Sequence, residues 1–162
     1  MARTVDDLDA RLIRLFTDNP RQSVLEASRL LKVARGTVQA RLDRLARSGV
    51  IAGWGPRIDP AALGYGVKAF VSLTINQKRG HTAVARELRA VPEILELHTV
   101  TGDADLLAVV VARSNPDLQR VLDRLAESGD VQRASSVIVL ESLFEQRAEG
   151  LIGTAGAEGA ES

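Results

Sequence analysis

The sequence of 162 residues contains no cysteine and few aromatic residues: one Trp, one Tyr and three Phe. Without thiols the chain cannot form disulfides, thiolate zinc sites, iron–sulfur clusters or a cysteine nucleophile. No apolar run approaches the length of about 18 residues that a membrane helix needs, and residues 1–7 are too polar to begin a signal peptide. A soluble, cytoplasmic protein with no membrane partner is therefore expected.

The sequence also has no net charge, but its two halves differ in sign. Residues 1–58 contain 11 Lys and Arg against 6 Asp and Glu, whereas residues 59–162 contain 10 against 15. A basic N-terminal part joined to an acidic C-terminal part indicates that the first part binds a polyanion. Apolar residues make up 45% of the chain, which is enough for a packed core and argues against general disorder.

Hydrophobic spacing in the basic half predicts three short helices. The first covers residues 6–18 and ends at Asn19-Pro20, because a proline disfavours helical backbone in the residue before it. Ser23 and Glu26 have the spacing of a capping box, so the second helix begins at Ser23 and runs to about residue 31. A third helix is expected over residues 35–48, followed by Gly49.

This outline is that of a helix-turn-helix, whose last helix reads the major groove of DNA. The third helix combines arginines with residues that can contact base edges, such as Gln39 for adenine and the Thr37 methyl group for thymine. Gly36 and Ala40 would allow close approach to the groove, and Arg41 and Arg44 are expected at phosphates. The candidate DNA-binding residues are Ser23, Lys32, Arg35, Gly36, Thr37, Gln39, Ala40, Arg41 and Arg44.

The acidic half has the pattern β-α-β-β-α-β. Strict alternation predicts a first strand, and the wholly apolar run Leu106–Ala112 predicts a strand covered on both faces. The expected elements are a strand at 67–76, a helix at 81–90, strands at 93–101 and 106–112, a helix from 114 to 129 and a strand at 131–140. This order is that of a ferredoxin-like domain. Two helices cover only one face of such a sheet, so residues on the other face, such as Phe70, predict a homodimer.

Several segments occur together in the order found in one regulator family. They are Asn19–Ser23, Thr37–Leu45, Gly49–Trp54, Asp59–Gly64 and Val100–Leu107. The chain resembles the Lrp/AsnC (feast/famine) transcriptional regulators over roughly residues 5–141. Lys32 and Ala34 stand where the family's turn usually has a glycine and a capping serine, and Ala104 stands where an aromatic residue is frequent.

The resemblance implies an α+β chain with a winged-type helix-turn-helix domain and a ferredoxin-like (RAM/ACT-like) domain. We expect the helix-turn-helix at 1–50, a linker at 51–66, a ferredoxin-like effector-binding and oligomerisation domain at 67–146 and a flexible tail at 147–162. The resemblance further implies binding to double-stranded DNA, homodimers that assemble into octamers or other higher oligomers, and a small-molecule effector, commonly an amino acid, near Gly102–Asp105.

The residues of that loop suit a zwitterion. Amides around Gly102 with Thr99 or Thr101 could hold a carboxylate, and Asp103 and Asp105 could accept an ammonium group. The candidate effector-binding residues are Thr99, Thr101, Gly102, Asp103, Ala104, Asp105, Ser135 and Ser136.

Catalytic chemistry has little support in the sequence. His81 and His98 are the only histidines, no phosphate-loop, G-x-S-x-G or H-E-x-x-H motif occurs, and two acids in a short loop more often form a turn than a metal site. We therefore expect no enzyme activity, catalytic residue, metal or cofactor. Two alternatives to an effector-responsive regulator remain: a small dimeric ferredoxin-like enzyme with an accessory helical domain, and an architectural DNA-binding protein without an effector.

Overall fold

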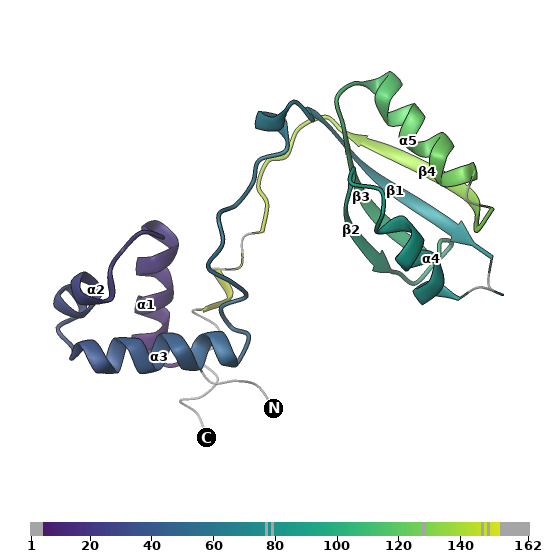
Figure 1. The fold of residues 1–162 in the computed structure, drawn as a ribbon. Helices are drawn as coiled ribbons and strands as arrows, with labels where there is room; N and C mark the ends of the chain where they lie inside the picture. Colours follow the sequence, from purple (N-terminus) through teal and green to yellow (C-terminus); the bar gives the residue numbers. More distant parts are fainter. Residues whose placement is uncertain are drawn as a thin grey trace. The chain divides into compact units, whose positions relative to one another are not determined.

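The computed structural model describes residues 5–76, 78, 80–127, 129–146, 148 and 150–152, and these residues form two compact units (Figure 1). The chain divides between Pro56 and Arg57 and again between Leu143 and Phe144. The expected linker, 51–66, is thus shared between the units, because Ile51 packs against the helical core and Trp54 packs on Phe16. Of the tail expected at 147–162, only Ala148 and residues 150–152 are described, and residues 150–152 are helical; the remainder lies outside the described residues.

The first unit contains the three expected helices, α1 (Asp7–Asp18), α2 (Val24–Leu31) and α3 (Arg35–Arg47). Their apolar stripes meet in a small core that contains Leu12, Phe16, Ala27, Val38 and Leu42. The Trp54 ring contacts the Phe16 ring edge to face, with 5.5 Å between the ring centroids. The sole tryptophan therefore packs within this unit.

The ends of these helices follow from local hydrogen bonds. Asp6 and Ser23 cap α1 and α2, and each forms a reciprocal capping box with the third helical residue, Asp9 or Glu26. Gly49 ends α3 with a φ of 76°, in the left-handed region that glycine adopts without steric cost. The capping box predicted for Ser23 and Glu26 is confirmed.

The second unit is a four-stranded antiparallel sheet with two helices. Its elements are a 3-10 turn η1 (Ala61–Leu63), β1 (Val67–Ile75), α4 (His81–Leu88), β2 (Ile94–Thr99), β3 (Leu106–Ala112), α5 (Asn115–Glu127) and β4 (Val131–Val139). The strand order is β2-β3-β1-β4. The predicted ferredoxin-like β-α-β-β-α-β order is confirmed. The β2 strand is shorter than the expected 93–101, because its pairing with β3 is irregular after Ile94 and the chain leaves the ladder after Thr99.

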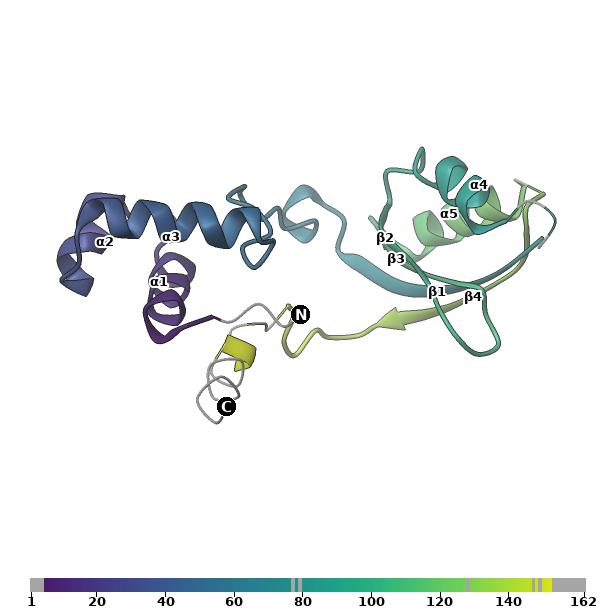
Figure 2. The same ribbon diagram turned by 90° about the horizontal axis from the view of Figure 1, so that it is seen from below.

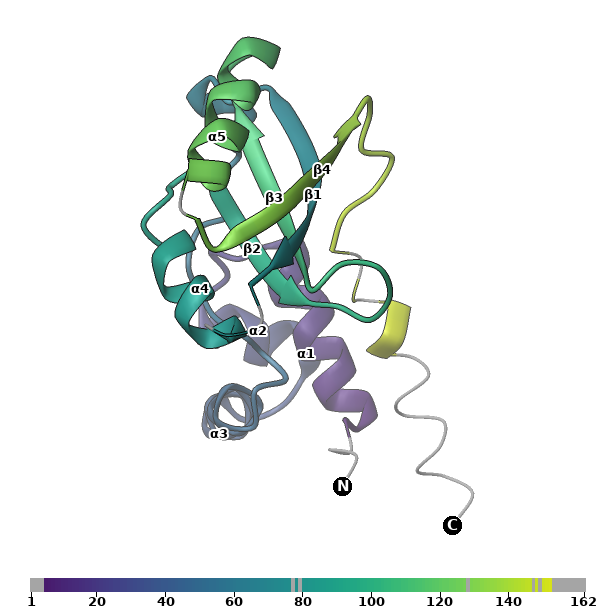
Figure 3. The same ribbon diagram turned by 90° about the vertical axis from the view of Figure 1, so that its right-hand side faces the viewer.

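Both helices lie on one face of the sheet (Figures 2 and 3). Alternate residues of β1, from Ala69 to Ile75, form the core with α4 and α5, as do Leu106, Ala108, Val110 and Ala112 of β3. The opposite face has no helix over it, and there Phe70 lies between its cross-strand partners Val109 and Val137. Phe70 is 40% exposed and Val137 is 68% exposed, so this face presents an apolar row to the surroundings. Within the described residues, the helices are all too short or too polar to cross a membrane.

Candidate functional site

The third helix presents most of the expected DNA-binding residues on its outer surface. Burial of Val38, Leu42 and Leu45 fixes the rotation of α3 against the other two helices. As a result, the α3 residues Arg35, Gly36, Thr37, Gln39 and Ala40 are exposed. Ser23 and Lys32, at the two ends of α2, are exposed as well. A Cβ atom placed on Gly36 would meet nothing within 4 Å, so the helix surface is open at this position. This exposed face combines residue types that can contact base edges in a major groove.

Arg41 and Arg44 form contacts within the helical unit that were not predicted from the sequence. Both guanidinium groups donate hydrogen bonds to the carboxylate of Asp9 on α1. Arg41 Nη1 donates to Asp9 Oδ1 at 2.9 Å, and Arg44 Nη2 donates to Asp9 Oδ2. Arg41 also donates to Asp6. The Asp9 side chain is fully buried, whereas those of Arg41 and Arg44 are 27% and 49% exposed. These arginines join α3 to α1, a role that their sequence positions did not reveal.

This charged cluster also changes ionisation equilibria. The hydrogen bond from Arg41 lowers the pKa of Asp6 below its usual value, and the same carboxylates, Asp6 first and then Asp9, raise the pKa of Arg41. A carboxyl group whose pKa is lower in the folded state stabilises the fold above its unfolded pKa of about 3.9. That contribution is lost as the pH falls from about 4 through the lowered pKa of Asp6.

The turn before α3 uses residues that are not the usual ones for its backbone. Lys32 adopts the left-handed conformation, with φ of 55° and ψ of 44°, at the end of α2. Ala34 occupies the N-cap of α3, and no side chain caps this end. The first turn of α3 contains no acidic residue either. The missing side-chain cap follows from the alanine, as expected from the sequence.

Replacing Ala34 by serine is expected to increase the free energy of unfolding of the helical unit by about 1 kcal/mol. Ala34 already has the extended backbone of an N-cap residue, so a hydroxyl there can accept a hydrogen bond from a free amide of α3. Thermal unfolding followed by Trp54 fluorescence measures the change. The matched control, Ala40→Ser in the exposed middle of α3, should decrease stability by about 0.5 kcal/mol. Equal shifts in both variants would contradict the capping argument.

A second candidate site lies on the helix-free face of the sheet. An open pocket of about 530 Å³ is lined by Ser72, Thr74, Val100, Thr101, Asp103, Ala104, Leu107, Arg133 and Ser135. The loop between β2 and β3 leans toward this face, away from α4 and α5 (Figures 2 and 3). The pocket combines a cation at Arg133, an acid at Asp103 and several hydroxyl groups. It can therefore bind a small molecule that has both a carboxylate and an ammonium group.

Four of the eight expected effector-binding residues line this pocket: Thr101, Asp103, Ala104 and Ser135. Thr99, Gly102, Asp105 and Ser136 do not. Ser135 pairs with Ser72 on the pocket face, and Ser136 points to the opposite face because successive strand residues alternate. Thr99 pairs with Leu106, which also faces the helices.

Asp105 has a structural contact that was not predicted from the sequence. Its carboxylate Oδ2 accepts a hydrogen bond of 2.8 Å from the Ile75 amide, and its own amide donates to the Leu73 carbonyl at 3.0 Å. Asp105 thereby joins the start of β3 to the end of β1. Asp103 is exposed and lines the pocket, so these two acids of the loop differ in role.

The pocket residues that come from the strands, above all Arg133, were not predicted from the sequence. Thr74 of β1 pairs with Arg133 of β4, and Ser72 pairs with both Leu107 and Ser135. Strand alternation alone would have placed Ser72 and Thr74 opposite the core residues Val71 and Leu73. What the sequence could not supply was the pairing of β1 with β4, which brings Arg133 to that face.

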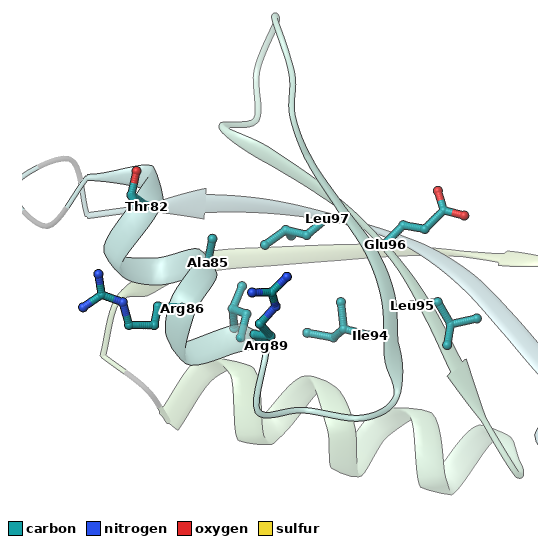
Figure 4. Close-up of a pocket in the computed structure, with 9 residues that line it drawn as sticks. Thr82, Ala85, Arg86, Arg89, Ile94, Leu95, Glu96 and Leu97 are labelled. Atoms are coloured by element: carbon teal, nitrogen blue, oxygen red, sulfur yellow. The ribbon is translucent and has the colours of Figure 1, made fainter. Parts of the chain in front are cut away.

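A further open pocket, of about 550 Å³, lies between α4 and the edge strand β2 (Figure 4). Arg89 lies across the space between Ala85 on the helix and Leu97 on the strand, whereas Glu96 points away from α4. No motif in the sequence pointed to this groove. In the part of the chain that the structure describes, no three His, Asp or Glu residues gather as a metal site. His98 and Glu96 form only an exposed pair at 3.0 Å.

Comparison with known proteins gives matches to both units. Residues 68–149 match the model of the Lrp/AsnC ligand binding domain, and residues 5–52 match a winged helix-turn-helix DNA-binding model. A Mycobacterium tuberculosis protein named HTH-type transcriptional regulator Rv2324 is 29% identical over 88% of this chain and 96% of its own length. An uncharacterised HTH-type transcriptional regulator of Pyrococcus abyssi is 32% identical over 83% of this chain and 85% of its own.

A solved structure extends this similarity to the fold. The feast or famine regulatory protein of M. tuberculosis, complexed with L-methionine, is 27% identical and superimposes with a TM-score of 0.77. The match covers 88% of this chain and 97% of the other. Both units are thus similar to parts of the same kind of protein.

Proposed function

Since the chain belongs to the Lrp/AsnC family of transcriptional regulators, we propose that it binds specific double-stranded DNA through α3 and responds to a small-molecule effector, of which an amino acid is the expected class. The observation that carries this proposal is the coexistence of two separate surfaces. One is the exposed face of α3, with Arg35, Gly36 and Gln39, and the other is the zwitterion-compatible pocket at Asp103 and Arg133. The relatives that match are named as regulators, which favours this function over a small ferredoxin-like enzyme.

The regulatory step is a linkage between effector binding and assembly. We propose that copies of the chain pair through the helix-free face of the sheet. On this face, the apolar row of Val109, Phe70 and Val137 lies beside the pocket. An effector bound beside this row would favour one dimer or higher assembly over another and change the spacing of the DNA-binding units. A coupling of about 1–3 kcal/mol would change DNA affinity about 5- to 150-fold.

Selection of bound sequences from a random DNA pool, repeated with individual amino acids, tests the proposal. We expect one enriched motif, and a change in affinity or in sedimenting size with at least one amino acid. Enrichment that no amino acid alters, together with unchanged size, would favour the architectural DNA-binding protein. An absence of enrichment would contradict sequence-specific binding itself.

Within the DNA-binding surface, Arg35 and Arg41 are expected to behave differently when each is replaced by alanine. Arg35 is exposed and has no ion pair among the described residues, so it can contact a phosphate. Arg35→Ala should make the negative slope of log affinity against log salt concentration shallower by about 1. Arg41→Ala removes the same charge but should leave that slope unchanged, because Arg41 is bound to Asp6 and Asp9. Fluorescence anisotropy at several salt concentrations measures both slopes, and equal slopes in the two variants would contradict this assignment.

In the pocket, Arg133→Ala is expected to weaken amino-acid binding at least about tenfold, because it removes a charged hydrogen-bond donor to the carboxylate. Isothermal titration with L-methionine, the ligand named for the M. tuberculosis structure, is the first measurement, followed by other amino acids. Arg113→Ala is a charge-matched control, since that guanidinium lies over the Tyr65 ring. Equal loss in both variants would contradict a direct contact from Arg133.

A further inference from the structure

The outer face of α3 contains a side-chain pair that the proposed function does not by itself explain. Gln39 Nε2 donates a hydrogen bond of 2.8 Å to Asp43 Oδ1, one helical turn further along. Both residues are exposed, and Asp43 is the only acid between Lys32 and Arg47. An acid on a surface that faces phosphates weakens binding, so its presence there calls for a specific role.

The carboxylate of Asp43 accepts a hydrogen bond from Gln39 and does not pair with a neighbouring cation among the described residues. Arg47 stands four residues after Asp43, a spacing at which an ion pair commonly forms on a helix, yet these two residues form none among the described contacts. The carboxylate therefore orients the Gln39 amide. It uses one of the two amide hydrogens and leaves the second hydrogen and the carbonyl oxygen without a described partner.

The free atoms of Gln39 are those that recognise adenine. A glutamine reads adenine by accepting from N6 through its carbonyl oxygen and donating to N7 through one amide hydrogen. Gln39 and Asp43 also line an open recess of about 260 Å³ together with Gln22 and Trp54. Without Asp43, the amide is free to rotate or to donate to phosphates, and both would weaken base discrimination.

We propose that Asp43 is a specificity-determining residue that positions the Gln39 amide to read an A·T base pair. This inference rests on the proposed DNA-binding function. Asp43 lowers affinity for DNA of any sequence through its charge and increases the preference of Gln39 for one base. A helix surface that gives up general affinity in this way gains discrimination between sites.

The test is a double-mutant cycle read as base preference. Sequences selected by the wild-type chain define the A·T position, and competition binding then compares that site with a site changed at this position alone. We expect Gln39→Ala to remove the preference, which is about 5- to 150-fold for a bidentate contact. The preference should decrease in the order wild type, D43N, D43A, by about threefold or more in D43A, because asparagine can still accept the hydrogen bond but without charge.

The decisive variant is the double substitution. In the Q39A background, D43A should leave base preference unchanged while it still increases affinity for DNA of all sequences about 2- to 5-fold, because the charge acts independently of Gln39. The chain offers a matched control on α5, where Gln119 Nε2 donates to Asp123 Oδ1 at 2.7 Å with the same spacing. D123A should alter neither base preference nor general affinity.

Two results would overturn the inference. One is an unchanged preference at the A·T position in D43A, and the other is an equal loss of preference from D43A with and without Gln39. Either can occur while the wild-type chain still selects a DNA motif, so the proposed function would stand. A wild-type chain that selects no motif would remove the proposed function and this inference together.

Discussion

Replacement of Asp9 by alanine is expected to lower the free energy of unfolding of the helical unit by about 2–4 kcal/mol. The substitution removes the carboxylate that accepts hydrogen bonds from Arg41 and Arg44 and from the Asp6 amide. Breaking a buried ion pair commonly costs about 3–5 kcal/mol, and the loss is smaller here because both arginines already reach water. A unit of this size has little stability to spare, so D9A should unfold near or below physiological temperature.

Urea and thermal unfolding, followed by Trp54 fluorescence, measure this effect. Trp54 is the only tryptophan and contacts Phe16, so its emission reports on the helical unit alone. D9N keeps the shape of the side chain and should lose only part of the stability, which allows a measurement if D9A does not fold. Asp7→Ala is the matched control, because its pair with Arg11 is exposed and 3.9 Å long. It should cost less than about 1 kcal/mol, and a loss in D9A no larger than in D7A would contradict a structural role for the buried cluster.

Gly36→Glu is expected to produce opposite changes in stability and in DNA binding. Gly36 is the second residue of α3, where glycine is a poor helix former and an acid is favourable near the helix N-terminus. The helical unit should therefore become more stable by about 1 kcal/mol. DNA affinity should fall about 100-fold, because the new side chain occupies open space on the face of α3 and carries negative charge toward the phosphates.

An increase in stability together with a loss of DNA affinity distinguishes this result from simple misfolding. Thermal unfolding and fluorescence anisotropy on the same samples provide the two measurements. Gly36→Ala adds only a methyl group and should lower affinity far less, which distinguishes size from charge. Thr17→Glu adds the same charge at an exposed position of α1 and should change affinity less than about threefold. If G36E bound DNA as tightly as the wild type, the DNA-binding surface would have to lie elsewhere than on the outer face of α3.

Local patterns predicted the elements of both units closely. The 3.6-residue spacing of apolar side chains and the Ser23–Glu26 box placed α1, α2 and α3, and alternation placed β1. These signals are reliable because they depend on residues that are near one another in sequence. Gly36, Gln39 and Ala40 are exposed, in agreement with the spacing of the apolar residues Val38, Leu42 and Leu45 of α3.

The partner of each charged side chain was not predictable in this way. Arg41 and Arg44 have the residue type of phosphate ligands, but Asp9, more than thirty residues earlier in the chain, accepts their hydrogen bonds. Asp105 has the residue type of an ammonium ligand, but its carboxylate accepts from the Ile75 amide. Arg133 was not predicted as a binding residue from the sequence, yet it lines the pocket because β4 pairs with β1.

The sequence by itself thus determined the order of the elements, the face that each one buries and the family to which the whole arrangement is similar. Only the tertiary structure decided which charges remain free to bind a ligand and which are neutralised by other parts of the chain. The physical reason is range: burial patterns repeat within a few residues, whereas an ion pair or a strand pairing depends on which distant segments packing brings together.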